Sequence, residues 1–311
     1  MIAKEKLRMM GTIIDIELNS QNADQQMVTV CQLLETYKNR FSANDDDSEL
    51  MAINHAAGKE PVSVHPDLYE LIEIGKENSF GDSNNLNIAI GPLVQTWRIG
   101  FSDANLPEDD NIQEVLALTN PNNIQLFPKT KSVFLTKEGM KIDLGALAKG
   151  YIADKIMNFL IEDGIYSALL NLGGNVLVHG KNKNRPDGRF YIGIQNPGKK
   201  RGVNLGIVKI ENQSVVTSGV YERHLTVNDK DYHHIFDRET GYPIETDMAS
   251  LTIIAEKSLD CEIWTTRLFG LNPMQAFHII NGLSGVEGII VTTHGTLAKT
   301  DGLKSNFHYL Y

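Results

Sequence analysis

The strongest constraint on the fold comes from the middle of the chain, where short apolar runs alternate with residues that form turns. The runs cover residues 168–172, 176–179, 190–195, 206–211 and 214–216, and Gly, Pro, Asn and Lys separate them. Runs of this length between turn residues predict short strands that pair as antiparallel neighbours. Helical patterns are bunched between groups of strands instead of following every strand, which favours an α+β protein over a repeating α/β fold.

Further helices and strands are predicted on both sides of this region. Helical patterns cover residues 25–40, 66–78, 109–118, 146–162, 261–268 and 273–281. Apolar and polar residues alternate at 12–18, and strands are also expected at 132–135, 140–143, 250–255 and 288–292. Ser48 is placed to cap a short helix that follows it.

Length and charge exclude several classes of protein. With 311 residues the chain forms one large domain or two closely packed subdomains, and we expect a single functional unit over residues 1–311. The net charge of −10 disfavours nucleic-acid binding, because an acidic surface repels phosphate backbones. No apolar stretch approaches the roughly 18 residues that a membrane span needs, so no membrane span is expected.

Cysteine content and the N-terminal residues bear on the compartment. Cys31 and Cys261 form no CxxC motif, so neither a zinc cluster nor a disulfide framework is predicted. The first residues contain neither the apolar segment of a signal peptide nor a lipobox-like cysteine. We expect a cytoplasmic location for the chain as given, or an extracytoplasmic one if a leader has been trimmed from it.

The segment DLGALAKGY, residues 143–151, is a candidate anion site. A strand end, a glycine turn and a helix start follow one another, and the amide groups of that start together with Lys149 could bind a phosphate. The same pattern also fits an ordinary strand–turn–helix unit with a surface lysine. The paired glycines of LNLGGNV, residues 170–176, fit either a tight turn or the close approach of a flat ring to the backbone.

Proton-transfer groups gather in TSGVYER, residues 217–223, and in HHIFDRETGYP, residues 233–243. The first segment has two hydroxyls beside a glycine, and the second has a doubled histidine near an aspartate. A histidine can act as a general base when a carboxylate orients it, although a structural role is also open. On a strand, His233 and His234 would point to opposite faces.

A pair of oxygen donors stands on the predicted helix at 261–268. Glu262 and Thr266 are one helical turn apart and project from the same face. A carboxylate with a hydroxyl is hard-oxygen ligation, which suits Mg²⁺ better than zinc. The alternative is a helix capped by Asp260, with Glu262 on the surface.

Taken in order, these segments resemble the ApbE family of FAD:protein FMN transferases. The resemblance also rests on Met10-Gly11-Thr12, on Ser48-Glu49-Leu50 with Asn54, and on Gly91-Pro92-Leu93-Val94 with Trp97. It spans roughly residues 10–270. It implies an α+β, T-fold-like architecture of antiparallel sheets with packed helices and an FAD site between subdomains.

The resemblance also implies an activity and a set of site residues. The activity is Mg²⁺-dependent transfer of FMN from FAD to a Thr or Ser hydroxyl of a target protein, a flavinylated redox subunit or domain, with release of AMP. The implied Mg²⁺ ligands are the Ala146 carbonyl, Glu262 and Thr266, with Asp260 as the alternative carboxylate because the family usually has an aspartate. His234 matches the catalytic histidine, and Asp237 would orient it. The implied flavin contacts are Met10, Asn44, Asn85, Leu86, Asn87, Asp143, Lys149, Thr217, Ser218 and Ile235.

Two alternative functions stay open. Many family members have a tyrosine where this chain has Asn44, in the stretch Ser42-Ala43-Asn44. An aromatic ring there would stack on the flavin, whereas Asn44 leaves the site more open to water, so an FAD pyrophosphatase that yields FMN and AMP is one alternative. A non-catalytic flavin-binding protein is the other, although Lys149 and His234 argue against it.

Overall fold

A computed structural model of the chain describes residues 1–221, 224–227 and 230–310. Within these residues a central sheet has eight strands, and neighbouring strands pair antiparallel. In spatial order the strands are β1 (Ile2–Met9), β2 (Thr12–Asn19), β6 (Ser167–Leu172), β7 (Asn175–Gly180), β10 (Ser214–Gly219), β13 (Met248–Ala255), β14 (Glu287–Thr292) and β15 (Leu297–Lys299). The prediction of an α+β protein built on antiparallel sheets is confirmed.

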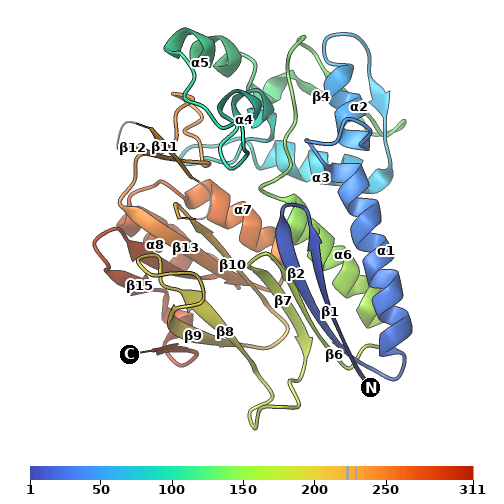
Figure 1. Cartoon of the computed structure of the whole chain (residues 1–311), viewed down its shortest axis with the longest axis vertical. Coiled ribbons are helices and arrows are strands. Elements are labelled where there is room, and N and C mark those ends of the chain that lie inside the picture. Colours follow the sequence, from blue (N-terminus) through green and yellow to red (C-terminus); the bar gives the residue numbers. More distant parts are fainter. Residues whose placement is uncertain (222–223, 228–229, 311) are drawn as a thin grey trace.

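Helices cover one face of this sheet, and a smaller sheet covers part of the other (Figure 1). The helices are α1 (Ala23–Phe41), α6 (Ala148–Glu162), α7 (Ser258–Leu268) and α8 (Pro273–Asn281), and the smaller sheet is β8 (Phe190–Gln195), β9 (Asn204–Ile210) and β16 (Phe307–Tyr309). Adjacent residues of β10 therefore enter different cores: Val215 packs toward β8 and β9, whereas Val216 packs toward α7 and α8.

The remaining elements gather at one end of the central sheet, the top of Figure 1. They are α2 (Glu49–His55), β3 (Val62–Ser63), α3 (Pro66–Glu77), the 3₁₀ turn η1 (Ile88–Ile90), α4 (Gly91–Trp97), α5 (Asp109–Leu116), the 3₁₀ turn η2 (Pro121–Asn123), β4 (Ile124–Phe127), β5 (Ser132–Leu135) and the hairpin β11 (His224–Val227) and β12 (Lys230–His233). Trp97 joins α4 to β12 and to the loop that follows it: its ring centroid lies 5.4 Å from that of Tyr232, and its Nε1–H donates to the Gly241 carbonyl at 3.1 Å. A last 3₁₀ turn, η3 (Asp301–Leu303), precedes β16.

The strand predicted at residues 140–143 is wrong. The Ile142 N–H donates to Asn54 Oδ1 at 2.8 Å, and Asn54 Nδ2 donates back to the Ile142 carbonyl at 3.1 Å. The next amide, that of Asp143, donates to the Ile88 carbonyl at 2.9 Å. One side chain and a 3₁₀ turn thus take the hydrogen bonds that a neighbouring strand would otherwise take.

Other elements also differ from the sequence-based prediction. Helix α6 begins at Ala148 instead of residue 146, because a turn at Gly145 comes first. Strand β10 extends through Ser218 to Gly219, so the two hydroxyls of the TSG motif lie on a strand. Strand β1 was not predicted, because the charged alternation of an edge strand hides its apolar face. Among the described residues no helix combines the length and apolar character needed to cross a membrane.

Helices α6 and α7 lie close to each other at Gly150. A Cβ atom there would lie 2.7 Å from the Ser258 carbonyl oxygen and 2.8 Å from the Leu259 backbone nitrogen. Backbone atoms cannot rotate away, so the crossing requires a residue without a side chain. The crossing sets the first turn of α6 beside the second turn of α7.

We expect Gly150→Ala to lower the free energy of unfolding by about 1–3 kcal/mol, because the helices must separate to admit the methyl group. Gly282→Ala at the end of α8 is the matched control, since a Cβ there meets carbonyl oxygens at an ordinary 3.5 Å. Urea denaturation of both variants gives the comparison. Equal stability of the Gly150→Ala protein and the wild type would contradict the close crossing.

Candidate active site

The residues predicted to bind phosphate and metal meet where α6 and α7 cross. Glu262 Oε2 accepts the backbone N–H of Gly150 at 2.8 Å, and Glu262 Oε1 lies 3.4 Å from Lys149 Nζ. The Glu262 side chain is 4% exposed, whereas that of Lys149 is 32% exposed. A buried carboxylate needs a cation and hydrogen-bond donors to offset its lost hydration, and this one has both. The Lys149 ammonium group therefore lies between the buried Glu262 carboxylate and the solvent.

The predicted Mg²⁺ ligands suit that ion. Ala146 is exposed just before α6, and Thr266 is half-buried one turn beyond Glu262. Gly150 is in the first turn of α6, where a backbone N–H has no partner within the helix, and its N–H donates to Glu262, which brings the carboxylate to the start of α6. A carbonyl, a carboxylate and a hydroxyl are hard oxygen donors. Of the two candidate carboxylates, Glu262 and not Asp260 makes this bond.

No cluster of three or more His, Cys, Asp or Glu side chains suited to a metal ion occurs within the described part of the chain. The predicted set of a carbonyl, a carboxylate and a hydroxyl contains no imidazole or thiolate, the ligands that most zinc sites in proteins include.

The predicted flavin contacts at residues 85–87 link α7 to the segment before α6. The Asn85 N–H donates to the Arg267 carbonyl at 3.1 Å, and Asn85 Nδ2 donates to the Phe269 carbonyl at 2.6 Å. Leu86 is buried, and its N–H donates to Asn84 Oδ1 at 2.9 Å. Asn87 Nδ2 donates to the Thr119 carbonyl, while its Oδ1 caps η1.

Asp143 lies next to the segment at residues 85–88. Its N–H donates to the carbonyl of Ile88, and its Oδ1 accepts the N–H of Gly145 at 2.7 Å. The second bond closes an Asx turn, which directs the chain into α6 and toward Lys149. The 85–88 segment, Asp143 and the α6–α7 crossing are therefore connected by direct contacts.

The two adjacent histidines have different surroundings. His233, the last residue of β12, is buried, and its ring lies edge-on to Phe269 with centroids 6.2 Å apart. Its Nδ1 accepts the Ile235 N–H at 3.2 Å, so the proton must be on Nε2, which donates to the Ile244 carbonyl at 2.7 Å. Burial lowers the pKa of His233, so the ring is neutral and structural. His234 follows the strand end and is half-buried.

Asp237 and Ile235 shape the loop after His234. Asp237 Oδ1 accepts the N–H groups of Glu239 and Thr240 at 2.7 and 3.0 Å, and these bonds stabilise the turn at residues 237–240. The half-buried Ile235 accepts the Ile244 N–H on its carbonyl. These bonds hold residues 235–244 as a closed loop beside His234.

The predicted contacts on β10 face opposite sides of the sheet. Thr217 lies on the same side as Val215, and its hydroxyl is 2.8 Å from that of Thr252. Ser218 lies on the same side as Val216, toward α7. A ligand beside α7 can reach the Ser218 hydroxyl and not that of Thr217. Glu222 and Arg223 of the same motif lie outside the described residues.

Met10 and Asn44 lie in turns. Met10 forms the β1–β2 turn with Gly11, both with positive φ (52° and 71°), and Met10 packs partly against the core. Asn44 is exposed in the loop between α1 and α2, where its Oδ1 lies 3.4 Å from Gln95 Nε2 of α4. Asn44 is thus open to solvent.

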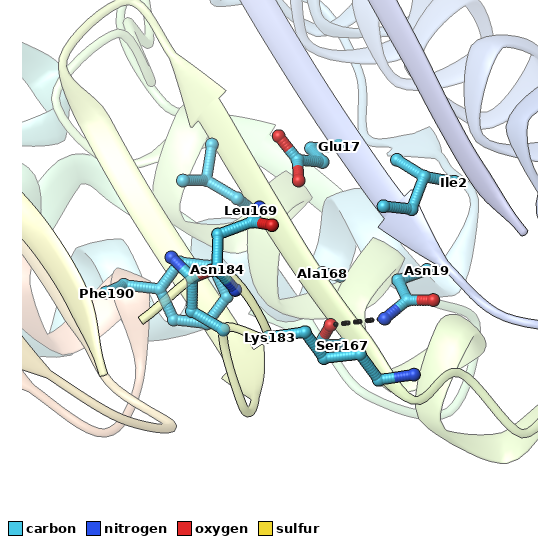
Figure 2. A pocket seen from close by; sticks show the side chains of 10 residues that line it. Ile2, Glu17, Asn19, Ser167, Ala168, Leu169, Lys183, Asn184 and Phe190 are labelled. Carbon is cyan, nitrogen blue, oxygen red and sulfur yellow. Dashed lines mark hydrogen bonds between the residues drawn. The ribbon is translucent and has the colours of Figure 1, made fainter. Parts of the chain in front are cut away.

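Two cavities differ in their capacity for a ligand. Figure 2 shows the smaller one, beside the Asn19–Ser167 hydrogen bond, and its volume of about 20 Å³ admits little more than one water molecule. The larger is a groove of about 400 Å³ lined in part by Asn87 and Arg238, a size that ligand sites commonly have. The smaller cavity contains none of the predicted site residues, and the larger contains Asn87.

One residue near the site was missed by the sequence reasoning. Asp154 of α6 accepts hydrogen bonds from the first two amides of α7, and burial raises its pKa to about 6. Its sequence signal is a lone aspartate in a mostly apolar helical pattern, one turn after Gly150. That signal could not identify its partner, which is distant in the sequence.

Comparisons with protein families and with known proteins point to the same family. A family model described as the ApbE family matches residues 10–290. An FAD:protein FMN transferase of Klebsiella pneumoniae (strain 342) is 40% identical over 285 residues, which cover 91% of this chain and 87% of the relative. One from Treponema pallidum (strain Nichols) is 35% identical over 276 residues, covering 84% and 75%.

Solved structures share the fold. The crystal structure of the ApbE protein from Thermotoga maritima MSB8 has a TM-score of 0.88 at 26% identity and covers 98% of both chains. The flavin transferase ApbE from Vibrio cholerae has a TM-score of 0.83 at 21% identity, covering 98% of this chain and 99% of that one.

We expect His233 to make the protein less stable in mild acid. Burial lowers the pKa of His233 in the folded state. Below about pH 6.5 this imidazole is therefore protonated in the unfolded chain but still neutral in the folded chain, so acid favours unfolding. His233→Gln removes that titration, and this variant should lose less stability than the wild type between about pH 7.5 and about pH 5. Urea denaturation at both pH values measures the effect, with the exposed His224→Gln as control. Equal losses in the wild type and in His233→Gln would contradict a buried, neutral ring.

Proposed function

This chain belongs to the ApbE family, and from that membership we propose that it is an FAD:protein FMN transferase, which moves FMN from FAD to a Thr or Ser hydroxyl of a target protein. The observation that carries the proposal is the Lys149–Glu262 pair at the start of α6. A reaction that breaks a pyrophosphate needs cationic groups beside the phosphate oxygens, where they stabilise negative charge. A protein of net charge −10 must therefore place such groups together at the site.

The bonds made and broken define the demands on the site. The acceptor hydroxyl oxygen attacks the phosphorus on the FMN side of the pyrophosphate, and the bond from that phosphorus to the bridging oxygen breaks. AMP leaves with the bridging oxygen, and the product is a phosphoester between the hydroxyl and FMN. A hydroxyl is a weak nucleophile near neutral pH, so a base must accept its proton. We assign that proton to His234, with Asp237 as the carboxylate that orients the ring.

The residues at the α6–α7 crossing bind the phosphates in this proposal. Mg²⁺ would be held by the Ala146 carbonyl, the Glu262 carboxylate and the Thr266 hydroxyl. When bound, the ion neutralises negative charge on the pyrophosphate oxygens. Lys149 and the first amides of α6 attract the same oxygens.

The remaining predicted contacts would bind the rest of FAD. Asn85, Leu86, Asn87 and Asp143 lie in connected segments beside α7, and this contiguity supports a common ligand. We propose that FAD lies between the α6–α7 layer and the end of the molecule formed by α2 to α5. Met10, Asn44, Ser218 and Ile235 would line its other sides, and Thr217 would act through the backbone because its hydroxyl bonds to Thr252.

One experiment tests the function. The purified chain is incubated with FAD and Mg²⁺, with and without a separate domain that carries the acceptor Thr or Ser, and mass spectrometry follows AMP and covalent flavin. A domain with the acceptor residue changed to Ala is the control. FMN on the acceptor supports transfer, free FMN in its place supports the pyrophosphatase alternative, and no AMP at all would contradict both.

We expect activity to depend on Mg²⁺ and on Glu262. Excess EDTA should abolish AMP release, and added Mg²⁺ should restore it. Glu262→Gln keeps an oxygen for the Gly150 N–H but loses the charge, so the fold should be retained while the Mg²⁺ requirement rises by about 10–100-fold. Asp260→Asn serves as the comparison. If Asp260→Asn is the damaging change and Glu262→Gln is silent, the ligand assignment is wrong.

His234→Ala should slow transfer by about 10²–10⁴-fold while FAD still binds, because the phosphates are held by Lys149 and the metal ligands. Single-turnover rates measure the chemistry, and quenching of flavin fluorescence measures binding. The exposed His224→Ala on the same hairpin controls for local disturbance. A wild-type rate in His234→Ala would remove this residue from the mechanism.

Asn44→Tyr should lower FAD hydrolysis relative to transfer. A ring at this exposed position would add a stacking surface and restrict water at the open side of the site. The measurement is the ratio of free FMN to protein-bound FMN, for the wild type and the variant under identical conditions. An unchanged ratio would show that position 44 does not choose between water and protein as acceptor.

A further inference from the structure

Helix α7 begins without a capping side chain of its own. Its N-cap residue is Lys257, whose side chain makes no capping bond. The caps come from α6 instead: Asp154 Oδ1 accepts the Ser258 N–H at 2.8 Å, and Asp154 Oδ2 accepts the Leu259 N–H at 2.9 Å. Both oxygens of one carboxylate thus satisfy the first amides of a neighbouring helix.

Helix α6 is capped in the same way by α7. Its N-cap residue, Leu147, makes no capping bond, and the Gly150 N–H in its first turn donates to Glu262 at 2.8 Å. Gly150 and Asp154 are one turn apart on α6, and Ser258 and Glu262 are one turn apart on α7. Each helix therefore carries the carboxylate that caps the other: Asp154 lies one turn beyond Gly150 on α6, and Glu262 lies one turn beyond Ser258 on α7.

This arrangement costs more than an ordinary cap. Burial, with the nearby carboxylates of Asp260 and Glu262, raises the pKa of Asp154 to about 6. Keeping the Asp154 carboxylate ionised therefore costs the folded protein free energy. A serine or aspartate at position 257 would cap α7 without burying a charge. A local cap would not, however, fix α7 to α6.

We propose that Asp154 is a positioning residue for the reaction: by holding the first turn of α7 on α6, it sets the Glu262 carboxylate beside Lys149 and the start of α6. Glu262 lies one turn beyond the capped amides, so any slip of α7 along α6 moves its carboxylate. The inference rests on the proposed function, because Glu262 is the carboxylate assigned to Mg²⁺ there.

The test separates helix capping from positioning. Asp154→Asn keeps the shape of the side chain but sets an NH₂ group against one of the two amides. Lys257→Ser gives α7 a local cap without a link to α6. The wild type, both single variants and the double variant are compared as full chains, with Glu162→Gln as control because it removes a charge from the exposed end of α6.

Three quantities are measured for each protein: the melting temperature, the affinity for Mg²⁺ alone by isothermal titration calorimetry, and kcat and KM for FAD with a tagged acceptor. Asp154→Asn should lower the melting temperature, and Lys257→Ser should restore it in the double variant. We expect the double variant to keep a kcat about tenfold below that of Lys257→Ser and a correspondingly weaker Mg²⁺ affinity. Glu162→Gln should match the wild type in all three quantities.

Other outcomes overturn the inference. If Lys257→Ser restores kcat and Mg²⁺ affinity together with the melting temperature, Asp154 is a helix cap and nothing more. If Asp154→Asn keeps the wild-type kcat and Mg²⁺ affinity, the inference fails while the proposed function stands. If the wild type transfers no FMN, the proposed function fails, and the Mg²⁺ affinity of the double variant then decides whether Asp154 positions Glu262.

Discussion

The bond between the Glu262 carboxylate and the Gly150 amide is the contact on which the site depends. It can form only because position 150 has no side chain, which lets the backbone of α6 approach that of α7. The same approach brings Lys149 to the buried carboxylate, whose charge would otherwise be uncompensated. A backbone feature thus decides the electrostatics of the proposed phosphate site.

Regular elements were predictable because their signals are local. Amphipathic spacing identified α1 and α3, and Ser48 was correctly predicted to cap α2, since its Oγ accepts the Met51 N–H at 3.0 Å. The strand predicted at 140–143 was wrong because the partner that takes its hydrogen bonds, Asn54, is remote in the sequence. A local pattern shows that a segment is apolar and extended, but not what pairs with it.

The site was predictable to a different degree. The ordered motifs identified the family, and the chain's own residues suggested that Glu262 and Thr266 share a helix face, which the position of both on α7 supports. Neither the burial of Glu262 nor its bond to Gly150 could be predicted, because both depend on how α6 crosses α7. From its own residues the doubled histidine was ambiguous, and only the family resemblance favoured His234 as the catalytic one. The tertiary contacts to Ile244 and Phe269 identify His233 as structural.

The N-terminus of α7 is hydrogen-bonded both to α6 and to the central sheet, and these bonds fix the position of the site residues on α7. The Ser258 amide donates to Asp154 of α6, while its hydroxyl donates to Asn175 of β7 and accepts from Ser214 of β10 at 3.0 Å. One residue therefore joins both helices to the central sheet through buried hydrogen bonds, which are costly to break. Charge stabilisation in a reaction is greatest when the charged groups are held before the substrate arrives. A carboxylate and an ammonium group mounted one turn from such a junction meet that condition, whereas the same groups on a loop would have to be ordered at each turnover.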